Sequence, residues 1–173
     1  AAAARGIMTT DPFPKEYGGK DGSNLWMAVI REHLAAKGLG LHNDLQTEHS
    51  IVANNPFVLM LRDFGTPEQQ AEFIDGMLEE RYRVTFGLTE AAHGSDATHM
   101  ETKAVAESRD GVAGWRIDGE KMWTTGMHVA THCALFARSS GAAGQARGIS
   151  CFLVPAGAPG VKIEEYLWTF NMP

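Results

Sequence analysis

The apolar residues of this chain change their spacing once, near Tyr82, and that change restricts the fold more than any other feature. Before Tyr82 they recur at three- and four-residue intervals, the pattern of amphipathic helices. From Arg83 onward they alternate with polar residues, the pattern of half-buried strands. Helices followed by strands are typical of an α+β protein and not of a sheet built from βαβ units. We therefore predict a helical domain over residues 1–82 and a β domain over residues 83–173.

The first two predicted helices differ in the clarity of their ends. Ser23 is a suitable N-cap for the first, whose apolar spacing reaches Gly38, a C-terminal stop signal. The second covers about Glu48–Asp63, with Pro56 at a break or kink.

The third predicted helix has the strongest start signal, in "GTPEQQAEFIDGMLEE". Thr66 is placed to cap it, Pro67 takes the first helical position, and Gln69 completes a capping box. We expect its buried face to consist of Phe73, Ile74, Met77 and Leu78.

The β half predicts a sheet that contains at least one hairpin. Asp118-Gly119 lies between two strand-like runs, which is a strong hairpin signal. The expected strands are "RVTFGL", "ETKAVAES", the two arms of "GWRIDGEKMWTT", "HCALFAR", "GISCFLV" and "VKIEEYL". The last one leaves an open sheet edge, and proteins normally cover such edges. We therefore expect the chain to be part of a longer protein, and a small open sheet is the alternative.

Composition argues against several classes of protein. Apolar residues make up 44% and charged residues 21%, which suffices for a packed core and argues against disorder. The net charge of −6, with mixed signs along the chain, argues against nucleic acid as a partner. Cys133 and Cys151 do not make a disulfide framework, and no apolar run approaches the length of a membrane span. We expect a cytoplasmic protein.

The segment "FGLTEAAHGSD" begins as a strand and then breaks into small and polar residues. Thr89 and Ser95 offer hydroxyls that both donate and accept hydrogen bonds. Ala91, Ala92 and Gly94 leave the backbone amides open to close approach by a ligand. A flat heteroaromatic ring or a pyrophosphate suits such a surface, and a polar turn without a ligand is the alternative.

The segment "EKMWTTG" places Trp123 two residues before Thr125, so in a strand both side chains share one face. An aromatic wall beside a hydrogen-bond donor suits a planar cofactor, and a tryptophan that only packs in the core is the alternative. His128 and His132 stand four residues apart, but in a turn that enters a strand and without a third ligand, so we expect no metal.

Together the two segments resemble the acyl-CoA dehydrogenase family, whose usual wording is close to "TEPGAGSD" and "W-x-I-N-G-x-K-x-W-I-T-N". The segments "PFPKEYGG" and "FGTPEQQAEFIDGML" resemble its helical domain, and the resemblance covers Pro12 to about Phe170. The family has an N-terminal helical domain, a middle β-barrel and a C-terminal four-helix domain. We expect this chain to carry only the first two, each in part, with the second as a truncated, antiparallel β-barrel-like domain.

The resemblance implies an FAD site between the barrel and the third domain. Phe86, Leu88 and Thr89 would line the flavin, with Thr89 bonding its pyrimidine edge. Trp123 would cover one face of the isoalloxazine, and Thr125 would hydrogen-bond near N5, the hydride-accepting atom.

The implied reaction is α,β-dehydrogenation of an acyl-CoA thioester, in which a carboxylate base removes an α-proton while a β-hydride passes to flavin N5. Ser95 would contact both the flavin phosphate and the acyl-CoA chain, and Gly94 belongs to the same cofactor-binding loop. The base lies in the third domain of the family, so we name no catalytic residue, and the match gives Glu90 a structural role. The implied partners are the acyl-CoA substrate, an electron-transfer flavoprotein or similar acceptor, and further copies of the chain. A eukaryotic member would lie in the mitochondrial matrix.

The chain departs from the family wording in two places. Ala91-Ala92-His93 replaces Pro-Gly-Ala, which affects the fit of acyl-CoA, while Thr124-Thr125-Gly126 replaces Ile-Thr-Asn and keeps the important hydroxyl. An acyl-CoA oxidase, a flavin monooxygenase and a non-catalytic module are the alternatives. We expect residues 1–173 alone to be inactive and to hold FAD poorly, because they supply one wall of the site.

Overall fold

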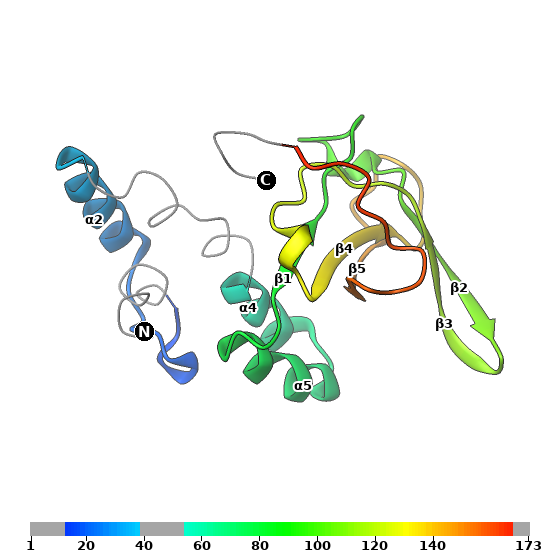
Figure 1. Ribbon diagram of the computed structural model, residues 1–173, viewed down its shortest axis with the longest axis horizontal. Helices are drawn as coiled ribbons and strands as arrows, with labels where there is room; N and C mark the ends of the chain where they lie inside the picture. Colours follow the sequence, from blue (N-terminus) through cyan, green and yellow to red (C-terminus); the bar gives the residue numbers. More distant parts are fainter. Residues whose placement is uncertain (1–12, 39–53, 168–173) are drawn as a thin grey trace. The chain divides into compact units, whose positions relative to one another are not determined.

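The computed structural model describes residues 13–38 and 54–167 (Figure 1). By internal contacts the chain divides into one unit that ends at Tyr82 and another that begins at Arg83. The first unit contains helices and the second contains the strands. The α+β class and the order of elements predicted from the change in apolar spacing are therefore confirmed.

The first α-helix, α2, covers Asn24–Ala36. The Ser23 hydroxyl accepts a hydrogen bond from Trp26 N at 3.3 Å, so the predicted N-cap is confirmed. A short 3₁₀ turn at Lys15–Tyr17 precedes this helix. Beside it Phe13 is buried, with its ring centroid 5.8 Å from that of Tyr17.

Helix α4 covers Asn54–Phe64 and buries Phe57, Val58 and Leu61. Its expected start at Glu48 lies outside the described residues. Pro56 lies in the first turn of α4, where a backbone N–H has no intrahelical acceptor, so the helix tolerates it there. Helix α4 thus continues through the proline without a break among the described residues, and a kink there stays a prediction.

Helix α5 covers Pro67–Leu78 and begins as the sequence predicts. Thr66 Oγ1 accepts from Gln69 N at 3.3 Å, and Gln69 Oε1 accepts from Thr66 N at 3.0 Å. Both arms of the capping box are thus present, with proline at the first helical position.

The buried face of α5 differs from the expected one at its end. Ile74 and Met77 are buried, whereas Leu78, the last helical residue, is exposed. Gly76 is buried instead, because a Cβ there would lie only 2.3 Å from the ring of Tyr82. The chain after the helix folds back over this glycine, and Tyr82 N donates to Gly76 O at 2.8 Å.

The second unit contains one five-stranded sheet (Figure 1). Its strands are β1 Val84–Gly87, β2 Lys103–Arg109, β3 Val112–Asp118, β4 His132–Arg138 and β5 Ile149–Pro155. The order is β1-β4-β2-β3, and β5 pairs with β4. Strands β2 and β3 form a long antiparallel hairpin, and β4 and β5 are also antiparallel.

The sheet is mixed, which departs from the antiparallel expectation. Strand β1 runs parallel to β4, from Val84 opposite His132 to Gly87 opposite Leu135. Strand β2 meets β4 at a single pair, Lys103 with Arg138, also in parallel orientation. Such pairing is possible because a long connection, which includes the β2–β3 hairpin, separates β1 from β4. The sheet does not close within the described part of the chain.

The hairpin turn lies at Asp110-Gly111 and not at the predicted Asp118-Gly119. Asp110 has φ 52 and Gly111 φ 80, as a two-residue type I′ turn requires. Gly119, with φ 152, comes directly after β3, where a Cβ would lie 2.5 Å from Thr102 Oγ1. A glycine is needed at this position because the backbone of residue 119 passes close to Thr102.

The predicted last strand, "VKIEEYL", is absent: residues 161–167 have no regular secondary structure. Ile163 and Tyr166 are exposed, so the alternating residues of this segment bury no common face within the described structure. Strands "RVTFGL", "ETKAVAES", "HCALFAR" and "GISCFLV" are confirmed within a residue or two at each end.

Candidate functional site

The loop after β1 is held by a small hydrogen-bonded turn. Glu90 N donates to His93 O at 3.2 Å, and His93 N donates to Glu90 O at 3.1 Å. Gly94 and Ser95 follow directly and are exposed. A Cβ on Gly94 would meet no heavy atom within 4 Å, so open space lies beside the backbone at this point.

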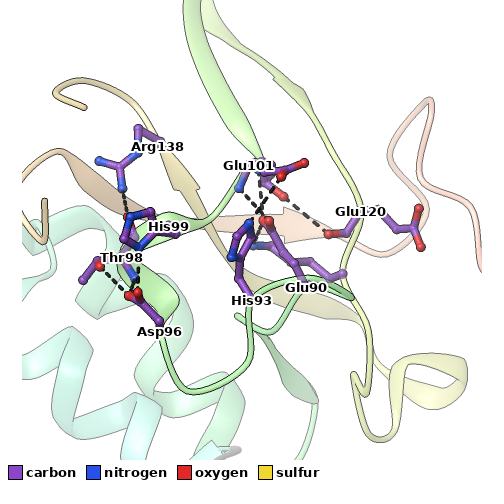
Figure 2. A network of polar contacts seen from close by, with 10 residues as sticks. Glu90, His93, Asp96, Thr98, His99, Glu101, Glu120 and Arg138 are labelled. Carbon is purple, nitrogen blue, oxygen red and sulfur yellow. Dashed lines mark hydrogen bonds and ion pairs between the residues drawn. The ribbon is translucent and has the colours of Figure 1, made fainter. Parts of the chain in front are cut away.

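The side chain of Glu90 is the buried anchor of this loop (Figure 2). Its Oε1 accepts from Lys121 Nζ at 2.8 Å and from Thr102 N at 2.9 Å, and its Oε2 accepts from Glu101 N at 2.6 Å. Burial by itself raises the pKa of Glu90, but the hydrogen bonds from Glu101, Lys121 and Thr102 outweigh burial and lower the pKa to about 2. The carboxylate is therefore ionised throughout the neutral range.

Lys121 connects the two segments that the sequence singled out. Its ammonium, like the Glu90 carboxylate, is buried, and it also donates to Leu88 O at 3.0 Å. The next residue, Met122, donates from its backbone N to Thr89 O at 2.9 Å. The loop after β1 and the segment that contains Trp123 are thus bonded to each other through both backbone and side chain.

The segment from Glu120 to Thr125 is not a strand, so the predicted second arm of the hairpin is wrong. Trp123 has φ 60, a left-handed conformation that is rare for a bulky residue. Thr125 N donates to Trp123 O at 3.0 Å, which closes a tight turn here. The argument that Trp123 and Thr125 share one face of a strand therefore does not apply.

The strained backbone presents the tryptophan to solvent. The Trp123 residue is 57% exposed, although large aromatic residues usually pack. Left-handed non-glycine residues persist where their surroundings hold them, and they are frequent at ligand sites. Next to it, Thr124 Oγ1 is buried without a hydrogen-bond partner among the described residues. Thr125 O accepts from the hydroxyl of Thr85 on β1, which fixes the turn to the sheet.

The seven residues predicted for the cofactor site fall into two groups. The hydrogen bonds of Lys121 and Met122 bring the first group together; it contains Phe86, Leu88, Thr89, Trp123 and Thr125. Gly94 and Ser95 form the second group, which is bonded through its neighbours to Glu101 and to the 3₁₀ turn Ala97–His99. Phe86 is half-buried in β1, and its ring centroid is 4.9 Å from that of Phe136.

Sequence reasoning missed the residues that hold these segments. Lys121 is part of a quoted motif, but nothing local indicates that it pairs with Glu90 thirty-one positions away. Arg138 ends the apolar strand β4 and is buried, with its guanidinium donating to the carbonyls of Thr98, Ser140 and Gln145. The sequence does place Arg138, a charged residue, at the end of an apolar strand, and that position was a signal of its structural role.

Two further observations concern residues 13–38 and 54–167. None of the helices there has the length and apolar character needed to cross a membrane. No three His, Cys, Asp or Glu side chains in the same ranges come together as possible metal ligands.

Comparison with known proteins agrees with the motifs. Residues 1–81 match the sequence model of the acyl-CoA dehydrogenase N-terminal domain, and residues 85–172 match that of the middle domain. This chain belongs to the acyl-CoA dehydrogenase family. Its helices and mixed sheet are accordingly the N-terminal and middle domains of that family, which is a family of oxidoreductases.

Individual relatives agree with the assignment to acyl-CoA dehydrogenases. Acyl-CoA dehydrogenase IpdE1 of Mycolicibacterium smegmatis is 35% identical over 110 residues, which cover 60% of this chain and 28% of the relative. The probable acyl-CoA dehydrogenase YngJ of Bacillus subtilis is 31% identical over 89% of this chain and 38% of its own length. A solved structure described as the FAD complex of PigA superposes with TM-score 0.68 at 26% identity, covering 92% of this chain and 39% of the other. This chain thus spans less than two fifths of the length of each of these three proteins.

Proposed function

We propose that this acyl-CoA dehydrogenase chain forms one wall of an FAD site in an enzyme that α,β-dehydrogenates an acyl-CoA thioester. The observation that carries the proposal is the bonding of the two motif segments to each other. Met122 N donates to Thr89 O at 2.9 Å, and Lys121 donates to both Leu88 O and Glu90. The buried Lys121–Glu90 ion pair and the backbone hydrogen bond hold the two segments side by side, so their side chains can contribute to one surface.

The residues of both segments fit a flavin. Trp123 offers an exposed aromatic face on a backbone held in a rare conformation. Thr89 and Thr125 are half-buried hydroxyl residues on the two bonded segments. Gly94 leaves open space where a phosphate or pyrophosphate could approach the backbone. Planar cofactors are bound by this combination of apolar surface and a few placed polar groups.

Each residue of this chain then has a defined task. Trp123 covers one face of the ring system and excludes water from it, while Thr89 and Thr125 orient the ring by hydrogen bonds. Ser95 offers its hydroxyl to the phosphate and to the acyl-CoA chain. When bound, the flavin supplies the two-electron acceptor that the thioester oxidation requires. We do not assign Glu90 as the catalytic base, because its carboxylate is buried and is held by three donors.

We also propose the partners that follow from this activity. An electron-transfer flavoprotein or similar acceptor would reoxidise the flavin, and the complete protein would be a homo-oligomer. The cytoplasm, or the mitochondrial matrix in a eukaryote, is the proposed compartment. The domain boundary at residues 82–83 is proposed to separate the helical part from the flavin-binding part.

Trp123→Ala is expected to weaken FAD binding by about 1–2 kcal/mol, roughly a five- to thirtyfold rise in Kd. The reason is the loss of a stacking aromatic surface. Because Trp123 is 57% exposed, the melting temperature should change little. FAD titration followed by flavin fluorescence measures the effect. Trp115→Ala is the matched control, since Trp115 is 52% exposed but lies in the β2–β3 hairpin. Equal effects of the two substitutions would contradict the assignment.

Gly94→Ala is expected to fold normally yet weaken FAD binding about tenfold or more, because the added methyl group occupies space proposed for the ligand. In the free chain a Cβ at this position meets nothing within 4 Å. Gly157→Ala is the matched control, since its Cβ also meets nothing within 4 Å and it lies outside the site. Calorimetric titration of both variants with FAD checks this. Unchanged affinity in Gly94→Ala would show that no ligand approaches the backbone here.

A further inference from the structure

Arg138 is a buried charged residue to which the proposed function gives no role. It ends β4, is 8% exposed, and forms no ion pair within the described ranges 13–38 and 54–167. Burial of a charge is costly unless the charged group is hydrogen-bonded. The guanidinium carries five N–H donors in a planar fork, so the groups that it binds indicate what the residue does.

The guanidinium binds two segments that are distant in the sequence. In the β4–β5 loop, residues 139–148, Nη1 donates to Ser140 O at 3.4 Å, and both Nη1 and Nη2 donate to Gln145 O at 3.2 Å. Nη2 also donates to Thr98 O, which is 40 positions away (Figure 2). The first contacts close the β4–β5 hairpin, whereas the last one joins its loop to the 3₁₀ turn Ala97–His99.

The backbone of the β4–β5 loop contacts the same turn. Gly144 N donates to Thr98 O at 2.9 Å, so this carbonyl accepts from both the loop and the guanidinium. Gly144 has φ 83, and a Cβ there would lie 3.1 Å from Nε2 of His99. The loop and the turn therefore lie against each other at the glycine.

Asp96 connects the turn to the small residues of the candidate site. Its Oδ1 accepts from Thr98 N at 3.2 Å and from the Thr98 hydroxyl at 2.5 Å. Its Oδ2 lies 2.6 Å from His99 Nδ1 (Figure 2). Ser95 directly precedes Asp96 in the chain. A shift of the turn would therefore be transmitted to Ser95 through one carboxylate and one peptide bond.

The contact of Arg138 complements that of Glu90. The Glu90 carboxylate accepts from Glu101 N and Thr102 N, and so joins the two ends of the segment that runs from residue 90 to residue 102. Arg138 N donates to Thr102 O at 2.9 Å, which places its side chain beside the same segment. The guanidinium then adds a contact inside the segment, at Thr98 O.

We propose that Arg138 is a positioning residue for Gly94 and Ser95: its guanidinium fixes the turn Ala97–His99 to the β4–β5 loop. Gly94 and Ser95 then meet their ligand already ordered, and less affinity is lost to ordering them. The identity of that ligand rests on the proposed function. The positioning itself rests on the two hydrogen bonds that Thr98 O accepts.

The first test replaces the guanidinium by another cation. Arg138→Lys keeps the charge but presents one nitrogen instead of a fork, so we expect it to lose either Thr98 or the β4–β5 loop. Amide 15N relaxation of the full chain should then show faster motion of Gly94 and Ser95, while hydrogen exchange of the β5 amides changes little. Arg116→Lys, at an exposed arginine of β3, is the control and should leave the loop unchanged.

A second variant reaches the same contact without altering the guanidinium, and it decides the question if the first variant does not fold. Gly144→Ala should push the β4–β5 loop away from His99, because its Cβ would lie 3.1 Å from the imidazole. Gly160→Ala is the matched control, since its φ of 90 gives similar backbone strain but its Cβ meets nothing within 4 Å. We expect Gly94 and Ser95 to become more mobile in Gly144→Ala alone.

Binding of FAD to the full chain then reports the functional consequence. We expect Arg138→Lys and Gly144→Ala to weaken it about three- to tenfold, and Gly160→Ala to leave it unchanged. Gly94 and Ser95 amides that stay as rigid as in the wild type, or a loosening that extends equally to β5, would overturn the inference. A loop that loosens as expected while FAD affinity is unchanged would support the positioning and contradict the proposed function alone.

Discussion

Lys121→Met is expected to destabilise the β unit by about 3–5 kcal/mol, because it leaves the Glu90 carboxylate buried without its cation. The side chains of Glu90 and Lys121 are only 8% and 7% exposed, so water cannot replace the lost partner. Hydrogen exchange of the β4 amides measures the free energy of opening of this unit.

Two comparisons separate this burial effect from a general effect of losing a lysine. Arg116→Met removes an exposed ion pair with Glu107 and should change stability by less than about 1 kcal/mol. The double variant Lys121→Met/Glu90→Leu should recover part of the loss, since no unpaired charge remains. A Lys121→Met variant as stable as Arg116→Met would contradict the role given to the pair.

The same pair predicts a pH dependence of stability. The pKa of Glu90 is lowered from 4.5 to about 2 on folding, so its contribution is fully present above about pH 4.5. It is lost as the pH falls through about 2, and amounts to about 3 kcal/mol. Glu90→Gln should therefore flatten the acid limb of the unfolding curve, which acid titration followed by circular dichroism measures.

Gly119→Ala is the second substitution with a large expected effect, about 3–5 kcal/mol of destabilisation from backbone strain and overpacking together. Gly119 has φ 152, and a Cβ there would lie 2.6 Å from Thr102 Cα, which cannot move aside. Thr102 is 2% exposed and donates its backbone N to Glu90, so the displacement would reach the loop anchor.

Gly111→Ala supplies the matched comparison for Gly119→Ala. Gly111 has φ 80 and its Cβ would meet nothing within 4 Å, so the substitution adds strain without a collision. We expect it to destabilise by about 1 kcal/mol. Urea denaturation of both variants measures the difference. Equal losses of stability in the two variants would show that the collision with Thr102 does not contribute to the effect of Gly119→Ala.

Features determined by neighbouring residues were predicted well. The capping box of Thr66 and Gln69 is a local device, and helix α5 begins where it indicates. The change of apolar spacing likewise predicted helices before Tyr82 and strands after it. These signals need no knowledge of the rest of the chain.

Features determined by distant contacts were not predicted. Asp110-Gly111 and Asp118-Gly119 carry the same local hairpin signal, and the two differ in the structure because β2 pairs with β3 across Asp110-Gly111. The segment around Trp123 alternates like a strand, yet Lys121 and Met122 bond it to the loop after β1 instead of to a neighbouring strand.

The candidate site shows the same division between local and distant information. The spacing of the two motifs located Thr89, Ser95, Trp123 and Thr125 in the sequence, and their roles toward a flavin stay a prediction. No motif could predict that Lys121 is the buried partner of Glu90, because the two residues meet only in the folded sheet.

The central claim is that the two bonded segments form one wall of a flavin site, and NMR mapping of FAD binding to the full chain tests it most directly. Half a pocket is expected to bind weakly, so FAD is added up to about millimolar concentration. The account predicts saturable shifts concentrated in the amides of Thr89, Gly94, Ser95 and Thr125 and in the indole N–H of Trp123. Shifts that do not saturate, or that concentrate in the β2–β3 hairpin, would contradict it.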